Sequence, residues 1–213
     1  MAKRILKELR EHAPFTFAGS AAGILFMLFF QNLPHRVSYN AFYILHPSHV
    51  FLSALVTASI FKLHTCGRVG GKCLKGKCNF LILLAIGYAG SIGIATLSDS
   101  LIPYAGEFLL NMPDRHVHLG FIEKWWLVNP LALAGIAIAY FKPSTKIPHL
   151  GHVLVSTFSS LFHILMAQGK TLTAGTSLVI LIFLFLAVLI PCCTSDIIFP
   201  MLFVKTANPV TPD

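Results

Sequence analysis

Two short motifs recur, in the same order, in the two halves of the chain. The first is His-x-x-His-Val-x-x-Ser, and the second, further along each half, is Ser-Asp-x-x-x-Pro. Their polar members are His46, His49, Ser53, Ser98 and Asp99 in the first half, and His149, His152, Ser156, Ser195 and Asp196 in the second. The shared order indicates an internal duplication of a site.

The residue types in these motifs are those of a transition-metal site. Histidines three positions apart lie on one face of a helix, and an aspartate from the next helix can supply a third ligand. Such a set suits zinc, iron, manganese, cobalt or nickel and leaves positions open for water or substrate. The predicted metal ligands are His46, His49, Asp99, His149, His152 and Asp196. Ser53, Ser98, Ser156 and Ser195 are predicted to orient those ligands.

The aspartates of the second motif stand inside long apolar runs. An ionised Asp at the bilayer centre costs about 2.5–3.5 kcal/mol on insertion scales, so such residues usually mark functional sites. A helix cap or a structural hydrogen bond is the alternative for Asp99 and Asp196. A single His pair would be read as an interfacial pair, but its duplication beside an Asp favours a site. The imidazoles could also carry protons.

The composition is that of a membrane protein. Of the 213 residues, 55% are hydrophobic and only 11% are charged, whereas a soluble domain carries about 25% charged residues. Six apolar segments are long enough to predict transmembrane helices: 15–33, 41–63, 80–103 (continuing towards residue 110), 125–141, 147–167 and 174–204. The net charge of +8 is not read as a nucleic-acid-binding signal, because the basic residues lie between apolar segments.

Three segments per repeat give the fold its symmetry. Because three is odd, the second repeat enters the membrane from the opposite side, which predicts an all-α polytopic protein of two inverted three-helix repeats. Helices three and six are expected to be broken, the sixth at Pro191 and Pro200. Pro47 and Pro148 are expected in the first turn of a helix or half-helix, with the His pairs beside them.

The basic residues predict an orientation. With the N-terminus in the cytoplasm, twelve of the 16 Lys and Arg residues fall inside and four outside, as the positive-inside rule requires. The predicted regions are a cytoplasmic amphipathic N-terminus (1–14), repeat one (15–110), an outer loop (111–124), repeat two (125–204) and a cytoplasmic tail (205–213). We expect an integral protein of a prokaryotic inner membrane, with the lipid bilayer and a metal ion as partners and a possible homo-oligomeric state.

The favoured function is transport. Helix positions predict one half-site near each membrane face, so an ion captured by one half-site would pass to its symmetry mate. A membrane transporter or channel for a divalent transition-metal cation is therefore the first hypothesis, and a non-enzyme is favoured over an enzyme. His64 and His163 have no repeat mates and are read as interfacial residues or a proton relay. His116 and His118 are read as solvated loop residues.

Two alternatives stay open. The string from Ser98 to Tyr104, downstream of a His-x-x-His segment, resembles a stretch of small bacterial membrane-bound metal-dependent hydrolases. The resemblance covers two short strings, lacks an Arg after the first His, and implies metal-activated water acting on a lipid or phosphoester. A haem protein is the third hypothesis, since His on facing helices can ligate haem axially; each pair here, however, lies on one helix.

Overall fold

The structure is a computed structural model of the whole chain. It describes residues 2–30, 32–65, 68–69, 72–73, 79–169, 173–193 and 198–204. Its long helices are α1 (Ala2–Phe29), α2 (His35–Thr65), α3 (Phe80–Thr96), α6 (Trp125–Phe141), α7 (Lys146–Ala167) and α8 (Ala174–Cys193). The short elements are strands β1 (Arg68–Val69) and β2 (Lys72–Cys73), the π-helical turn η1 (Leu97–Leu101), and helices α4 (Ile102–Leu109), α5 (Gly120–Glu123) and α9 (Phe199–Leu202).

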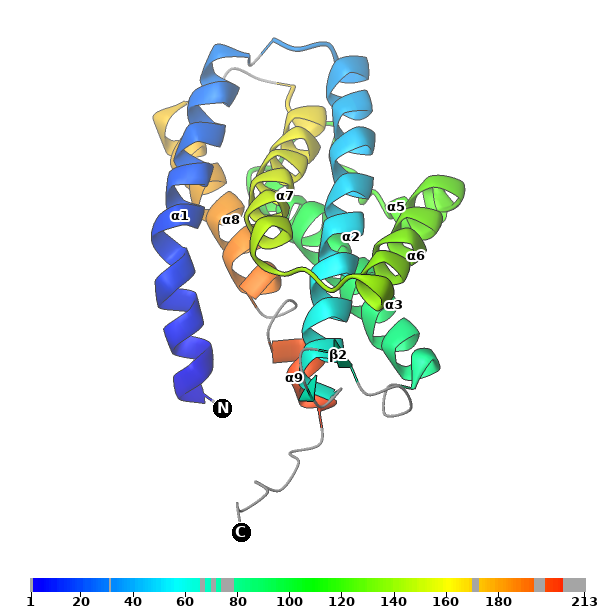
Figure 1. The fold of residues 1–213 in the computed structure, drawn as a ribbon. Helices are drawn as coiled ribbons and strands as arrows, with labels where there is room; N and C mark the ends of the chain where they lie inside the picture. The colour runs from blue at the N-terminus through cyan, green and yellow to red at the C-terminus, as the bar shows by residue number, and fades with distance from the viewer. Residues whose placement is uncertain are drawn as a thin grey trace.

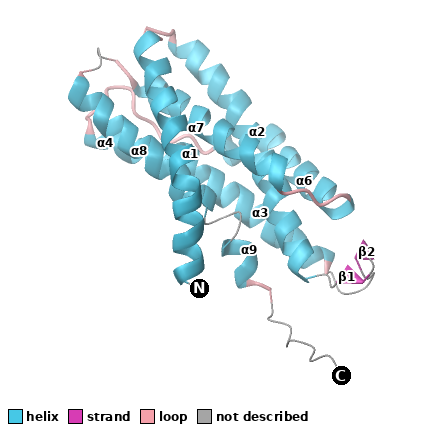
Figure 2. Ribbon diagram, turned by 60° about the vertical axis from the view of Figure 1, so that its left-hand side comes forward, coloured by secondary structure: helices cyan, strands magenta, loops and turns pink. Residues whose placement is uncertain are grey.

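The described part of the chain is a helix bundle with one small hairpin (Figure 1). The beginning of α1, the β1–β2 hairpin and α9 lie at one end, and the end of α1, the beginning of α2 and the end of α7 lie at the other (Figures 1 and 2). We call the latter the far end. Helices α2 and α7 pack against each other; α6 and α3 pack on α2, while α1 and α8 pack on α7. The short helices follow the same scheme, since α9 contacts α2 and α4 contacts α7.

Within the described ranges, three helical stretches are long and apolar enough to cross a membrane: His35–Thr65, Phe80–Leu109 and Ala174–Pro191. Three shorter apolar helices accompany them, over Ala13–Phe29, Trp125–Phe141 and Gly151–Ala167. Each of the six predicted apolar segments thus contains or overlaps one of these apolar helices. Large apolar side chains cover the outside of the bundle, including Leu25, Phe29, Leu81, Leu109, Trp125, Phe141 and Leu178. So much exposed apolar surface matches a lipid environment.

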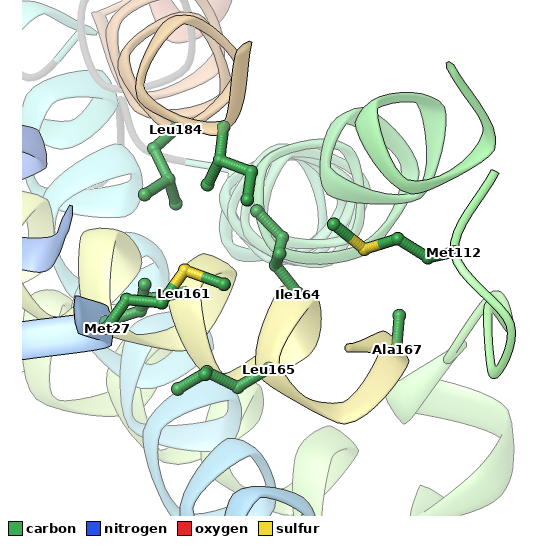
Figure 3. Close-up of a cluster of buried hydrophobic side chains, with 8 residues drawn as sticks. Met27, Met112, Leu161, Ile164, Leu165, Ala167 and Leu184 are labelled. Carbon is green, nitrogen blue, oxygen red and sulfur yellow. The ribbon is translucent and has the colours of Figure 1, made fainter. Parts of the chain in front are cut away.

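The core that holds the α7 side of the bundle is apolar. Met27 of α1, Leu184 of α8 and Leu161 of α7 are fully buried together. Ile164, Leu165 and Ala167 extend this cluster towards the end of α7, where Met112 joins it (Figure 3). The cluster fixes α7 between α1, α8 and the chain after α4.

Pro47 and Pro148 were both predicted in the first turn of a helix, and the structure confirms this for only one of them. Pro148 lies in the first turn of α7, as predicted. Pro47, however, lies in the interior of α2, which begins twelve residues earlier at His35. The prediction that Pro47 starts a helix is therefore wrong. The predicted segment 41–63 is shorter than α2 because the first turns of this helix, at the far end, contain polar residues and do not belong to the apolar run.

Helix three is not broken as predicted, but it contains a π-helical turn. Residues Phe80–Leu109 form one continuous helical stretch, in which Leu97–Leu101 is wound as a π-helix between α3 and α4. A π-turn widens the helix by an extra residue, and such turns are frequent at functional sites. The sixth apolar segment is divided between α8, which ends at Cys193, and α9, which begins at Phe199.

Candidate cation site

Asp99 occupies the middle of the π-helical turn η1 and is fully buried. Its carboxylate accepts four hydrogen bonds. Oδ1 accepts from the hydroxyls of Ser98 at 2.7 Å and Ser156 at 3.1 Å. Oδ2 accepts from Nδ1 of His46 at 3.0 Å and Nδ1 of His49 at 2.7 Å. Each oxygen thus accepts two hydrogen bonds, which is the full acceptor capacity of a carboxylate, from donors on η1, α2 and α7.

The two histidines of α2 are held by the same carboxylate oxygen. Because a carboxylate only accepts, each Nδ1 carries the proton, and each Nε2 is a bare lone pair. Both rings are buried, and neither His46 Nε2 nor His49 Nε2 has a hydrogen-bond partner. A buried polar atom without a partner costs free energy, so these two nitrogens need an explanation beyond the hydrogen bonds of the described residues.

The second repeat contributes directly to the same cluster. The ring of His152 on α7 lies against that of His49, with ring centroids 4.4 Å apart, and both side chains are fully buried. Ser156, one turn after His152, is the residue that donates to Asp99. The described members of the two predicted half-sites are therefore in contact. The expectation of one separate half-site near each face is corrected, because α2 and α7 cross at the level of these residues.

The remaining predicted site residues divide into two groups. Ser53 is buried on α2, but its hydroxyl has no hydrogen-bond partner, so its predicted orienting role is not observed. The side chain of His149, and Ser195 and Asp196 entirely, lie outside what the structure describes. The metal-ligand predictions for His149 and Asp196, and the orienting role predicted for Ser195, stay predictions.

Asp99 has a different role from the one expected. Among the described residues, no three His, Cys, Asp or Glu side chains are arranged to hold a metal ion together. The reason at Asp99 is that its four acceptor positions are occupied by Ser98, Ser156 and the two His. It is placed to orient the two imidazoles, as carboxylates behind metal-bound His do.

Gly120, the first residue of α5, closes the site over His46. A Cβ at this position would lie 2.5 Å from Cδ2 and 2.6 Å from Nε2 of His46. Glycine is therefore required for the chain to approach this ring so closely. Phe42 stacks on His46, with centroids 5.2 Å apart and nearly parallel rings, and so fixes the plane of the imidazole.

A second polar cluster lies nearer the far end of the bundle. His163 Nδ1 donates to Oε1 of Glu107 at 2.7 Å, and His163 Nε2 lies 3.3 Å from the hydroxyl of Ser100. The amide of His118 donates to that hydroxyl at 3.1 Å. Because Ser100 accepts from this amide, its own proton is available for His163 Nε2. Glu107, His163 and Ser100 are all buried.

The loop before α5 connects this cluster to the surface. The ring of His118 lies 5.3 Å from that of His163, and its Nδ1 lies 3.2 Å from Glu123 Oε2. Tyr43 also donates to Glu123. The side chains of His118 and Glu123 are 18% and 36% exposed, so the polar chain runs from solvent-accessible groups to buried ones.

Two loop groups have displaced pKa values. Burial, together with the nearby His163, lowers the pKa of His118 below its ordinary value of 6.5 and outweighs the hydrogen bond to Glu123, which acts in the opposite direction. Burial alone would raise the pKa of Glu123, but hydrogen bonds from Tyr43 and His118 outweigh it and lower that pKa below 4.5. Both groups therefore favour the forms that keep the loop closed at neutral pH, a neutral imidazole beside a carboxylate.

Sequence reasoning missed this second cluster, although a signal was present. Polar residues follow one another on one face of α7 at helical spacing: His152, Ser156, Ser160 and His163. All four are buried, and Ser160 donates to the carbonyl of Ser98 at 2.9 Å. A buried polar stripe along an apolar helix would have placed His163 with the site instead of at the interface.

Comparisons with known proteins add no relative: no family model, curated protein or solved structure matches this chain.

Proposed function

We propose that this protein is a helical membrane transporter for a divalent transition-metal cation, bound through Nε2 of His46 and His49. The observation that carries the proposal is the pair of buried Nε2 atoms without partners, on rings whose Nδ1 atoms are both tied to Asp99. Imidazole nitrogen is a preferred donor for zinc, iron, cobalt and nickel, and a carboxylate on the other ring nitrogen raises its basicity.

A metal ion needs more donors than these two. His152 is close by, against His49, and His149 and Asp196 are the predicted ligands that the duplicated motif adds. Water would complete the shell, as in sites that exchange their ion. Transport requires weak and exchangeable coordination, so an incomplete protein shell suits a cargo ion better than a permanent structural one.

The packing supports an inverted-repeat transporter. Under the proposed symmetry α2 corresponds to α7, α1 to α6, and α3–α4 to α8–α9. The observed neighbours obey this exchange: α6 on α2 matches α1 on α7, α3 on α6 matches α8 on α1, and α9 on α2 matches α4 on α7. The site lies at the α2–α7 crossing, where a repeat interface places transport sites.

The two alternatives have less support. A metal-dependent hydrolase needs one site with a fixed ion. Asp99 is not free to hold such an ion, because its oxygens accept hydrogen bonds from His46, from His49 and from Ser156 of the other repeat. Haem ligation needs two imidazoles with a porphyrin between them. The closest rings from different helices, His49 and His152, are in direct contact.

Metal uptake into proteoliposomes tests the proposal. The purified protein is reconstituted around a metal-sensitive dye, and zinc, manganese, cobalt and nickel are added outside in turn. Wild type should accumulate at least one of these ions, and H46A and H49A should abolish uptake. H64A is the matched control, because His64 is an exposed histidine of the same helix that contacts only the carbonyl of Ile60. Wild-type vesicles that admit no ion faster than empty vesicles would refute the proposal.

A further inference from the structure

The buried Glu107–His163 pair has no place in cation binding. Glu107 is on α4 and His163 on α7, and both are about 1% exposed. Oε1 of Glu107 accepts from His163, but Oε2 is buried without any hydrogen-bond partner. A carboxylate oxygen desolvated in this way is costly. Ionisable groups buried within membrane helices mark ion or proton pathways.

Among the described residues, no cationic side chain forms an ion pair with Glu107 other than His163 itself. On α2 the pair faces the ring of Phe42, which meets His163 edge to face, and on η1 it faces Ser100. From the loop it faces His118, with Glu123 behind. The two basic side chains of the segment 111–124 are engaged elsewhere: Arg115 with Asn111 and the carbonyl of Met112, and Lys124 over the rings of Tyr39 and Tyr43.

A proton is the cation that fits this space. The neutral His163 with an ionised Glu107 carries one net negative charge, and one added proton makes the pair neutral. If Ser100 turns its hydroxyl away, the proton binds at His163 Nε2 and the imidazolium pairs with Glu107 across the existing 2.7 Å contact. If it binds at Oε2, Glu107 becomes a neutral acid. Either form removes the uncompensated charge from the apolar interior.

The route to the pair is also present. Glu123 and His118 are partly exposed, and His118 lies directly against His163. Protonation of His118 and its release from Glu123 would free the loop that covers Ser100. An imidazole that reaches both solvent and a buried partner is a suitable proton shuttle.

We infer that Glu107 and His163 form a proton-binding pair, loaded through Glu123 and His118, that couples proton movement to cation transport. The inference rests on the proposed function for its coupling step. Proton binding is inferred only from Glu107, His163 and their surroundings. Proton binding and its coupling to transport are therefore measured in separate experiments.

Infrared difference spectroscopy tests the proton site. Full-length protein in lipid bilayers is acidified stepwise, and the carbonyl band of protonated carboxylic acids and the ring bands of imidazolium are followed. Wild type should show a component that E107Q and H163N both lack. D114N and H116N are matched controls, since Asp114 and His116 are exposed residues of the same loop, and both should keep the component. Identical spectra for wild type, E107Q and H163N would overturn the inference.

Paired flux measurements test the coupling. Vesicles that contain a metal-sensitive and a pH-sensitive dye report both ions at once. Wild-type metal uptake should change several-fold when a pH gradient is imposed, and E107Q should lose this response while it binds the metal with wild-type affinity. An E107Q protein that keeps the response overturns the inference alone. A wild type that moves no metal overturns the proposed function and the coupling with it.

A labelling experiment separates one competing chemistry. His163 contacts Ser100 through one ring nitrogen and Glu107 through the other. This arrangement also matches a hydrolytic triad of nucleophile, base and orienting carboxylate. Covalent capture of Ser100 by a fluorophosphonate probe, lost in S100A, would make the cluster hydrolytic and overturn the proton assignment. The inference predicts that Ser100 stays unlabelled.

Discussion

Ser156 on α7 donates a hydrogen bond of 3.1 Å to Oδ1 of Asp99 on η1. This bond joins a residue of one motif copy to the central carboxylate of the other. It occupies an acceptor position that a metal ion would otherwise use, and it ties the α2–α7 crossing to the π-helical turn. The site is consequently one shared cluster, oriented by Asp99.

Replacing Ser156 with Ala should weaken the cluster moderately. A hydrogen bond to a charged group contributes about 1.5–3 kcal/mol, so S156A should lower the free energy of unfolding by that amount in detergent. T157A is the matched control, because Thr157 is buried beside it but donates only to the carbonyl of Val153. Equal thermal shifts for S156A and T157A would contradict the shared-cluster geometry.

Asp99→Asn should affect ion affinity more than stability. The Asn amide keeps an acceptor for one side but presents N–H groups towards the two His, which forces at least one imidazole to change tautomer and direct its proton to Nε2. We expect a loss of about 1–3 kcal/mol in stability and a 10–100-fold weaker metal affinity. Isothermal titration with zinc and thermal unfolding measure the two effects. Unchanged affinity in a folded D99N protein would argue against the orienting role.

Gly120→Ala should disturb His46 without changing any charge. The new Cβ would lie 2.6 Å from His46 Nε2, so either α5 or the imidazole must move, and the bond from His46 to Asp99 should be lost. We expect lower metal affinity than in wild type. G93A is the control, because a Cβ at Gly93 meets nothing within 4 Å. If G120A binds metal as tightly as G93A, Nε2 of His46 is not a ligand.

Acid should open the loop that precedes α5. Since the pKa of His118 is lowered from 6.5, the closed loop binds a proton less readily than the open one. Its stability is therefore complete above pH 6.5 and falls as the pH drops towards the lowered pKa. The lowered pKa of Glu123 acts in the same direction below pH 4.5. The size of both effects is reduced by solvent screening, because both groups are partly exposed.

Hydrogen exchange at the amides of His118 and Leu119 measures this opening, because they donate to Ser100 and Glu123 respectively. After correction for intrinsic exchange, protection should fall as the pH drops below 6.5 in wild type. H118N should flatten this part of the profile. Protection that rises on acidification would contradict the sign of the His118 shift.

The sequence predicted the positions of the helices well because each long helix contains a long, mainly apolar segment. The segment 125–141 coincides with α6, and 147–167 differs from α7 by one residue. The site was predicted in part. The duplicated motif singled out His46, His49, His152 and Asp99, and these residues lie together in the structure. Their roles were not predictable, because the extra residue of a π-turn at Asp99 and the crossing of α2 with α7 are tertiary features. Glu107 and His163 lacked a repeat mate and so gave no duplication signal.

X-ray absorption spectroscopy of the zinc- or cobalt-loaded protein tests the central claim most directly. Imidazole nitrogens bound to zinc lie at about 2.0–2.1 Å and give a characteristic multiple-scattering pattern. The account predicts at least two imidazole ligands in wild type, both lost in the H46A/H49A double variant and retained in H64A. A wild-type spectrum without imidazole ligands, or one that the double variant leaves unchanged, would contradict cation binding by His46 and His49.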